Sequence, residues 1–488
     1  MGHLQFHLDA AASTKDFEHY WEKCVGSCHG YTALREDYRN QLKKVKEDVG
    51  FQYVRFHGIL NDDMSVVFEK EHGGLEYNFV NIDNIIDFLL SIDMRPFIEI
   101  SFMPSPFASG EQTCFHYKGN VTMPKDFQLW DSFIVTFIQH LVERYGVEEV
   151  QKWYFEVWNE PNLKFFFAGN QEDYFTLYEH TVRAIKSVDA GLRTGGPSTA
   201  NNAWILDIIE YCKKNHVPID FISTHHYPTD DPNWNGDMNL DDFIQKEKRD
   251  TGGEVDRRGI LTRMAKKAKA EAGELPLYYT EWNTSANEGD AVHDTSYSSA
   301  LMVKTLLDNY GYADIYSFWT FSDIFEEHGQ APGEFRGGFG LQTIHGIPKP
   351  AYRALELMHQ LGSRQYQKEA EQGTAGVFAA SGRDEKMCII AYNHEMPGKP
   401  IKAENIKIDI KNISVVSASI QRIDDAHANA RSEWEKMGSP VYPDTEQIKS
   451  LKRASFVQEE TLCVTKTENG ISLEFCLPEH GVALIKLK

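Results

Sequence analysis

Between about residue 20 and residue 360, short apolar runs alternate with longer stretches whose apolar residues recur every three or four positions. One such stretch, from Tyr38 to Val49, places its apolar side chains on a single helical face, and another extends from Trp130 to Arg144. Strands that alternate with helices in this way form a parallel sheet, and eight such units fit a closed barrel. The sequence therefore predicts the α/β class, as a (β/α)8 TIM barrel with enlarged loops. The predicted strands are Cys24–Cys28, Tyr53–Leu60, Pro96–Phe102, Trp153–Trp158, Arg193–Gly196, Phe221–His225, Leu277–Thr280 and Ile315–Phe321.

Beyond Gly362 the pattern changes to short alternating strands separated by turn signals such as Asn469-Gly470. Strands of this kind join in antiparallel fashion, which predicts a C-terminal β-sandwich accessory domain over residues 361–488. The charged segment 425–455 is predicted to be an excursion from this domain. The predicted sandwich strands are Val377–Ala380, Met387–Tyr392, Ile406–Ile410, Val415–Ile423, Thr461–Thr465, Ile471–Phe475 and Val482–Leu487.

The start of the chain is assigned to the C-terminal domain as well. Leu4–Leu8 alternates apolar and polar residues, so residues 1–14 are predicted to add a strand to the sandwich. The catalytic barrel is then predicted over residues 15–360. Met1–Asp16 has neither a basic region nor a long apolar run, which is unlike a secretory signal peptide.

The net charge and the cysteine content exclude some classes of partner and indicate a cellular location. Its formal net charge of −22 repels nucleic acid and anionic membranes, so we expect neither as a partner. No stretch of about 18 apolar residues is present to span a membrane. The seven cysteines are scattered and odd in number, so Cys24 and Cys28 are interpreted as buried thiols and the location as cytoplasmic.

Two glutamates follow β-rich apolar segments. Glu160 comes after Trp153–Val157, and Glu281 comes after Leu275–Tyr279. Because the active sites of such barrels lie at the carboxyl ends of the strands, both carboxylates are predicted to reach one pocket. Hydrolysis of a glycosidic bond requires such a pair, one to protonate the leaving oxygen and one to attack the sugar or activate water.

The tripeptide Asn159-Glu160-Pro161 also has a purely structural interpretation. Asparagine is a frequent helix N-cap and proline is frequent at the first helical position, so the tripeptide also suits the start of a helix. That interpretation explains neither Glu281 nor the aromatic residues beside both glutamates. We therefore favour the catalytic interpretation and keep the helix cap as the alternative.

Several short motifs lie at or beside the ends of the predicted barrel strands. They are Arg55–Gly58, Glu99–Pro104, Glu156–Lys164, Thr280–Ser285, Val292–Thr295, Trp319–Glu327 and Gly337–Leu341. In composition and order they resemble the β-xylosidases of glycoside hydrolase family 39, within clan A of the retaining glycosidases. In that clan an Asn-Glu pair follows strand four and a lone Glu follows strand seven, as Asn159-Glu160 and Glu281 do here.

The resemblance implies that Glu160 is the general acid/base and Glu281 the nucleophile of a double displacement. It implies an exo-acting β-xylosidase that releases D-xylose from the non-reducing end of β-1,4-xylo-oligosaccharides, with no cofactor and no metal. A retaining mechanism needs the two carboxyl groups about 5–5.5 Å apart. Burial against aromatic rings and repulsion from ionised Glu281 would both keep Glu160 protonated near neutral pH.

The same resemblance implies a set of sugar ligands. Asn159 matches the donor to the 2-hydroxyl, His57 matches a ligand of the 3-hydroxyl, and His225 and Tyr227 match the residues that end the sixth strand. A lone histidine such as His57 can also be a hydrogen-bonded core residue. Adjacent His225 and His226 suggest metal ligands, but neighbouring strand residues point to opposite faces, which argues against a metal.

Further ligands are implied around the eighth strand. Trp319 matches the floor beneath the sugar, with Phe115 and Phe166 on its flanks, although such aromatics are also ordinary barrel core. Glu326 and Glu327 match carboxylates that accept hydrogen bonds from the 3- and 4-hydroxyls. Because a paired acidic loop is usually solvated, we expect that only one of the two faces the pocket.

Other activities require other residues. An α-L-iduronidase or an arabinosidase of the same family would use the same glutamates, and an iduronidase needs a cation for its substrate's carboxylate, for which Arg336 is the obvious candidate. A metal-dependent barrel hydrolase needs a His-x-His near the first strand, where Cys24 and Cys28 stand instead. A sugar-binding protein without activity would lack one glutamate. The sandwich and its excursion are a candidate surface for a homo-oligomer.

Overall fold

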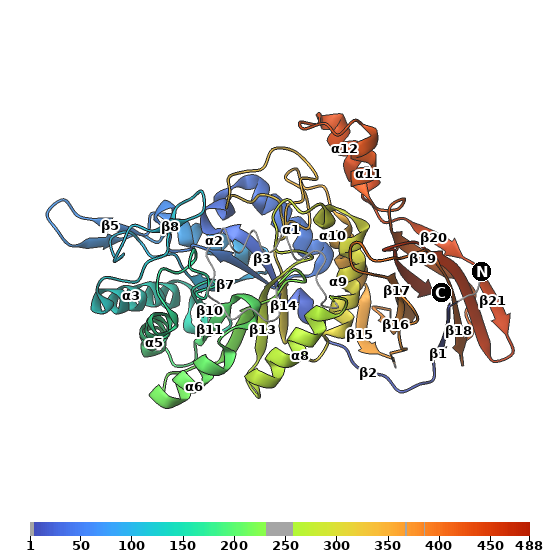
Figure 1. Ribbon diagram of the computed structural model, residues 1–488, viewed down its shortest axis with the longest axis horizontal. Coiled ribbons are helices and arrows are strands. Elements are labelled where there is room, and N and C mark those ends of the chain that lie inside the picture. The colour runs from blue at the N-terminus through green and yellow to red at the C-terminus, as the bar shows by residue number, and fades with distance from the viewer. Residues whose placement is uncertain (1–3, 231–256, 367, 385) are drawn as a thin grey trace.

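Eight parallel strands close into a barrel at the centre of the molecule (Figure 1). The computed structural model describes residues 4–230, 257–366, 368–384 and 386–488. The barrel strands are β3 (Cys24–His29), β4 (Tyr53–His57), β7 (Arg95–Ile100), β10 (Tyr154–Val157), β11 (Arg193–Thr199), β12 (Phe221–His225), β13 (Leu277–Trp282) and β14 (Ile315–Phe318). Strands that are consecutive in this order pair in parallel, and β14 pairs with β3 to close the ring. The predicted barrel is therefore confirmed.

Two barrel strands end three residues before the end that the sequence pattern predicts. The strand β4 ends at His57 rather than at Leu60, and β14 ends at Phe318 rather than at Phe321. Gly58 has a φ of 63°, a left-handed conformation that suits glycine and ends β4. His57 therefore lies at the carboxyl end of its strand. Short hairpins leave the barrel as β5 (Val67–Glu69) with β6 (Leu75–Tyr77) and β8 (Thr113–Cys114) with β9 (Gly119–Asn120).

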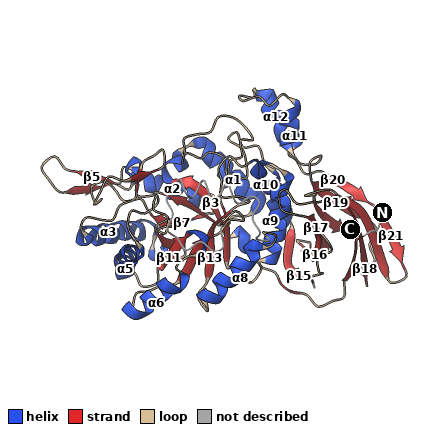
Figure 2. Ribbon diagram, viewed as in Figure 1, coloured by secondary structure: helices blue, strands red, loops and turns tan. Residues whose placement is uncertain are grey.

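Helices surround the barrel and bury their apolar faces against it (Figure 2). In α1 (Glu36–Val49) the predicted face of Tyr38, Leu42, Val45 and Val49 is fully buried. Burying one such side chain stabilises a fold by roughly 1.5–3 kcal/mol. The other α-helices around the barrel, in the described part of the chain, are α2 (Val80–Ser91), α3 (Phe127–Tyr145), α4 (Val147–Val150), α5 (Gln171–Val188), α6 (Ile205–Asn215), α8 (Ile260–Ala272), α9 (Ser296–Asp308) and α10 (Pro350–His359).

Two sheets pack into a sandwich beside the barrel, around an aliphatic core of their own. The larger has the order β2-β15-β16-β17-β23-β19-β20 and the smaller the order β1-β18-β22-β21. The N-terminal strand β1 runs parallel to β18, with Phe6 opposite Ile408. The strands are β1 (Leu4–Asp9), β2 (Lys15–Asp16), β15 (Leu361–Gln365), β16 (Ala375–Gly382), β17 (Met387–Asn393), β18 (Glu404–Lys411), β19 (Ala418–Ile423), β20 (Glu459–Leu462), β21 (Val464–Thr467), β22 (Gly470–Leu477) and β23 (Val482–Leu487).

The charged segment 425–455 projects from the sandwich as two short helices, α11 (Ala430–Lys436) and α12 (Thr445–Ala454), at the top of Figure 1. It packs on a barrel loop through Trp434 and Phe335, whose ring centroids lie 5.5 Å apart. The excursion therefore contacts the barrel as well as the sandwich.

All seven cysteines are free, and Cys24 and Cys28 are buried, as predicted. Within the described parts of the chain, no helix combines the length and the apolar character that crossing a membrane requires.

Candidate active site

A pocket of about 1360 Å³ opens at the carboxyl ends of the barrel strands. Glu160, after β10, and Glu281, in β13, both line it and keep only 8% and 4% of their surface exposed. An oxygen of one carboxylate lies within 4.8 Å of an oxygen of the other. That separation suits a nucleophile and an acid that act on the same sugar carbon and leaving oxygen.

The loop after β10 has a backbone that brings Glu160 into the pocket. Trp158 and Glu160 have φ values of 69° and 44°, which are unusual for residues with side chains. Hydrogen bonds fix this conformation: the Glu160 N–H donates to Ser198 O at 2.8 Å, and Trp158 Nε1 donates to Phe166 O at 2.8 Å.

The helix-cap interpretation of Asn159-Glu160-Pro161 is wrong. Among the described residues, the next helix after β10 is α5, which begins at Gln171 and is capped by Asn170. Asn159 is buried, and its Oδ1 accepts a hydrogen bond from Arg55 Nη2 at 2.9 Å. Its Nδ2 is buried and has no hydrogen-bond partner in the described structure.

Glu281 is held by two donors. Arg55 Nη1 donates to its Oε1 at 2.8 Å, and the Tyr227 hydroxyl donates to its Oε2 at 2.9 Å. Arg55 is itself fully buried and also forms ion pairs with Glu99 and Glu156, at 2.8 and 2.6 Å. A rigid cation therefore fixes the position of Glu281 from below.

The surroundings of the two carboxylates separate their protonation. Burial raises the pKa of Glu160 well above its usual value, and the negative charges of Glu281 and Asp230 raise it further. Burial also raises the pKa of Glu281, but the charges of Arg55 and His57 oppose this rise. Because only Glu281 is bonded to a guanidinium, the proton that the pair shares resides on Glu160.

Hydrogen bonds hold His225 beside the acid. Its Nε2 lies between two hydroxyls, 3.1 Å from Thr280 Oγ1 and 3.2 Å from Ser198 Oγ. Burial holds the pKa of His225 well below its usual value, and the charges of Arg55 and His57 lower it further, so the ring is neutral. His225 faces Glu160 Oε1 with its Nδ1, 2.9 Å away, and a neutral ring adds no positive charge that would stabilise the ionised acid.

Aromatic rings and a histidine surround the space above the carboxylates. His57, Phe115, Phe166 and Trp319 all line the pocket. Trp319 packs on His57 with ring centroids 4.6 Å apart, and Phe115 meets Phe166 edge to face at 5.1 Å. A Cβ on Gly26 would lie 2.5 Å from the Trp319 ring, so only glycine leaves room for it. These rings are therefore pocket walls as well as core.

The histidine at the end of β4 faces two carboxylates of the pocket, Glu281 and Glu327. His57 Nδ1 donates to Glu99 Oε2 at 2.7 Å. Its Nε2 lies 3.6 Å from Glu327 Oε1 and 3.8 Å from Glu281 Oε1. The ring is thus held from behind and keeps Nε2 for the pocket.

Of the two carboxylates after β14, only one faces the pocket, as expected from the sequence. Glu327 lines the pocket, whereas Glu326 does not and instead accepts a hydrogen bond from Arg35 Nη1 at 3.1 Å. Glu326 is therefore removed from the predicted set of sugar ligands. Burial, followed by the charges of Glu281 and Glu288, raises the pKa of Glu327 well above its usual value.

Neither His225 nor Asn159 forms part of the pocket wall. Asn159 lies beneath it, beside Arg55, and His225 lies behind Glu160. His225 is therefore better described as a positioning residue than as a sugar ligand. Tyr227, by contrast, lines the pocket.

Sequence reasoning missed part of this site. Arg55 stands two positions before His57 in β4, and a two-residue spacing places both on one face of a strand, so that signal was available. Asp230, Glu288 and Asp323 line the pocket from irregular loops. Loops lack the repeating apolar pattern from which helices and strands can be predicted. Residues 231–256 lie outside the described residues.

Donor atoms of Glu160, His225 and Glu281 lie within 4.8 Å of one another, so this geometry would also admit a divalent cation. The metal-dependent hydrolase alternative, however, places its ligands near the first strand. There β3 supplies Cys24 and Cys28, and burial raises the pKa of the Cys24 thiol to about 12. A thiol that stays protonated is a poor metal ligand.

An eight-stranded barrel whose fourth and seventh strands place two glutamates together in one pocket defines a glycoside hydrolase of the barrel class. The model of the glycosyl hydrolases family 39 matches residues 4–470, and the chain belongs to this family.

Relatives resemble the chain over nearly its whole length. It is 48% identical over 474 residues to a β-xylosidase of Caldicellulosiruptor saccharolyticus, which covers 96% of this chain and 95% of the relative. It is 36% identical to a β-xylosidase of Geobacillus stearothermophilus, over 97% of this chain and 93% of the relative. The solved structure of a family 39 β-xylosidase from Caulobacter crescentus superposes with a TM-score of 0.84 at 32% identity, over 99% of this chain and 100% of that one.

Proposed function

We propose that this chain is a retaining exo-β-xylosidase that releases D-xylose from the non-reducing end of β-1,4-xylo-oligosaccharides. The observation that carries the proposal is the close pair of Glu160 and Glu281 in opposite surroundings, one among anions and one on a buried arginine. The β-xylosidase relatives that match nearly the full chain support the glycone.

In the first step, Glu281 attacks the anomeric carbon while Glu160 gives its proton to the departing glycosidic oxygen. The carbon–oxygen bond of the glycoside breaks and a glycosyl ester of Glu281 forms. Arg55 and Tyr227 hold the nucleophile, and His225 orients the acid through its Nδ1.

In the second step, water attacks the same carbon from the side that the leaving group has vacated. The ester has removed the negative charge of Glu281, which lowers the pKa of Glu160 and lets it act as a base. Glu160 takes a proton from the water, the ester bond breaks, and β-xylose leaves with retained configuration. Asn159 stays the proposed donor to the 2-hydroxyl, and its Nδ2, which has no hydrogen-bond partner in the described structure, is the atom that would donate.

The charge of the pocket favours a neutral glycone over a uronate. Arg336 is the only lysine or arginine among the described lining residues, and its Nε donates to Pro332 O at 3.2 Å. A substrate carboxylate would therefore meet like charge, which argues against the iduronidase alternative. The carboxylates that line the pocket are Glu160, Asp230, Glu281, Glu288, Asp290, Asp323 and Glu327.

We also propose a cytoplasmic location, because five of the seven free cysteines are buried thiols that a reducing compartment preserves. Homo-oligomerisation through the excursion 425–455 stays a prediction that sedimentation of the purified protein would test.

A screen of aryl glycosides tests the proposed activity. Substrates of β-xylose, both ring forms of arabinose, β-glucose and iduronate are compared with and without EDTA, and the configuration of the released sugar is followed by NMR. We expect β-xyloside to be hydrolysed fastest, with retention and no effect of EDTA. Preferred hydrolysis of the iduronide or an arabinoside would contradict the glycone, and loss of activity in EDTA would contradict the metal-free mechanism.

A further inference from the structure

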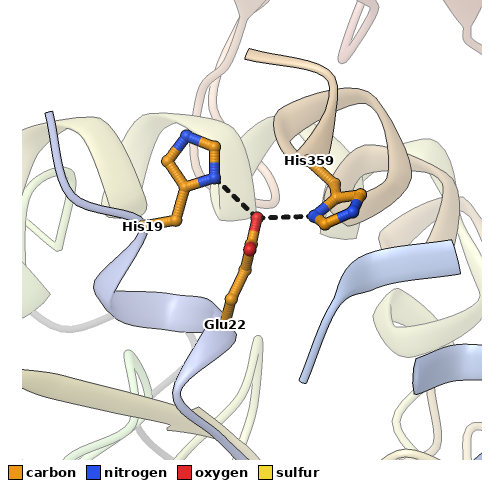
Figure 3. A group of neighbouring side chains, drawn as sticks. All are labelled: His19, Glu22 and His359. Atoms are coloured by element: carbon orange, nitrogen blue, oxygen red, sulfur yellow. Dashed lines mark hydrogen bonds and ion pairs between the residues drawn. The ribbon is translucent and has the colours of Figure 1, made fainter. Parts of the chain in front are cut away.

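A second cluster of ionisable side chains lies at the opposite end of the barrel from the pocket. Glu22 closes the short helix η1 (Tyr20–Glu22), just before the amino end of β3, and His359 is the last residue of α10. His19 and His359 point at the same carboxylate oxygen of Glu22 from its two sides (Figure 3). The Nδ1 atoms lie 2.6 and 2.8 Å from Glu22 Oε1.

The cluster of His19, Glu22 and His359 is held in place before any ligand binds. Its side chains keep only 14%, 10% and 19% of their surface exposed. The His19 ring stacks on Trp21 with centroids 4.6 Å apart. A Cβ on Gly50, which has a φ of 85°, would lie 2.5 Å from His359 Cε1, so glycine is needed behind the cluster.

The donor set suits a borderline transition metal. Two imidazole nitrogens and one carboxylate oxygen, all within 4.8 Å of one another, are the ligands that Zn²⁺ takes when a fourth position is left to water. Zinc bonds of about 2.0–2.2 Å in a tetrahedron separate neighbouring donors by roughly 3.3 Å. Admitting the ion would widen the present spacings of 2.6 and 2.8 Å between Glu22 Oε1 and the ring nitrogens by roughly 0.5–0.7 Å. Mg²⁺ and Ca²⁺ prefer oxygen ligands and fit less well.

Arg383 is the one cation that contacts this cluster in the described structure. Its Nη2 lies 3.0 Å from Nδ1 and 2.7 Å from Nε2 of His359. A point close to both ring nitrogens lies over the face of an imidazole and not in line with either lone pair. Arg383 is exposed, so it can turn into solvent when a metal adds positive charge.

We propose that His19, Glu22 and His359 form a structural Zn²⁺ site. The ion would take the place of the ring hydrogens that now point at Glu22: a neutral ring would carry its hydrogen on Nε2 instead, and a doubly protonated ring would release one proton. It would tie the segment before the first barrel strand to the end of α10, next to Arg383 of the sandwich, whose Nε donates to His359 O at 2.9 Å. Because the site is remote from the pocket, the ion would stabilise the fold without taking part in hydrolysis.

Metal binding by the full chain tests this proposal. The protein is stripped with a chelator and dialysed against ZnCl₂, and bound zinc is measured by mass spectrometry together with the melting temperature and xylosidase activity. We expect one Zn²⁺ per chain, a rise in melting temperature of roughly 2 °C or more at saturation, and unchanged activity. Co²⁺ should give the visible absorption of a four-coordinate site.

Two variants and one control identify the ligands. His359→Gln and the nearly isosteric Glu22→Gln should each weaken zinc binding at least tenfold and abolish the rise in melting temperature. His140→Gln should behave as the wild type, because His140 bonds a single carboxylate, Asp83, at 2.7 Å. Absence of stoichiometric zinc, or equal binding by both cluster variants, would overturn the proposal. Zinc that inhibits hydrolysis at the concentration at which it binds would also overturn it, by placing the ion on Glu160, His225 and Glu281.

Discussion

Glu160 and Glu22 are both buried glutamates beside histidine, yet their pKa values move in opposite directions. At Glu22, burial raises the pKa, but hydrogen bonds from His19 and His359 outweigh it and the pKa is lowered. At Glu160, burial acts together with the charges of Glu281 and Asp230, and the pKa is raised well above its usual value.

The difference shows what separates a reactive carboxylate from a structural one. Glu22 receives hydrogens from two rings, so its charge is stabilised. Glu160 lies among the carboxylates of Glu281, Asp230 and Glu327, so its neutral form is stabilised. Burial is common to both glutamates, and the hydrogens or charges of their neighbours decide the direction of the pKa shift.

The largest effect is expected at the nucleophile. Glu281→Ala should lower turnover by roughly four orders of magnitude or more, because no glycosyl ester can form. Added azide should then attack the sugar directly and give an inverted glycosyl azide, which NMR identifies. Unchanged turnover, or an azide product of retained configuration, would remove Glu281 from this role.

A smaller effect that depends on the leaving group is expected at the acid. Glu160→Ala should lower the rate with xylobiose by roughly 10²–10⁴, because its leaving alcohol needs a proton. An aryl xyloside with an acidic phenol should instead show a burst of phenol and a slow steady state, which azide accelerates with retention.

The neighbouring acid Glu326, which is bonded to Arg35, provides the matched control. Glu326→Ala should leave both substrates within a few-fold of the wild type. Equal losses on both substrates in Glu160→Ala, without an azide effect, would mean that the acid lies elsewhere.

A pH profile tests whether Asp230 raises the pKa of Glu160. Activity should fall as pH rises through the raised pKa of Glu160, because the deprotonated residue cannot protonate the leaving group. Asp230→Asn removes one charge that raises this pKa, so the alkaline limb of kcat/KM for xylobiose should move to lower pH. An alkaline limb that stays in place would show that Asp230 does not act on Glu160.

The smallest effect is expected on the free energy of unfolding when Glu22 is replaced. Because the folded-state pKa of Glu22 is lowered, its ionised form stabilises the fold above the unfolded-state pKa of about 4.3, and this contribution is lost as pH falls through the folded-state pKa. In metal-free protein, Glu22→Gln should cost roughly 1–2 kcal/mol at neutral pH. Urea unfolding at pH 7 and pH 4 measures the difference, which should shrink at the lower pH. A difference that does not change with pH would contradict the assignment.

Most of the fold could be predicted from the sequence because apolar residues recur at regular intervals in its helices and strands. Apolar runs at β-strand length and the Tyr38–Val49 face specify strands and helices locally, and parallel strand ends then bring Glu160 and Glu281 together. The pairing of Leu4–Asp9 with the sandwich was also readable, from simple alternation.

Contacts made by loops or by distant residues could not be predicted in this way. Neighbouring residues such as Glu326 and Glu327 have identical chemistry, and only the position of Arg35 shows which of them turns away. His19, Glu22 and His359 form no sequence motif, because 337 residues separate Glu22 from His359. Such clusters exist only once the fold has brought their elements together.

The place of β1 in the sandwich has a consequence for the synthesis of this protein. Its partner strand β18 leaves the ribosome about 400 residues later, which at about 5–20 residues per second is a delay of roughly 20–80 s. During that time Phe6 and Leu8, which are buried in the finished sheet, have no strand to cover them. This early strand is thus among the last to fold, and a chaperone that holds nascent chains would meet it before its partner strand is made.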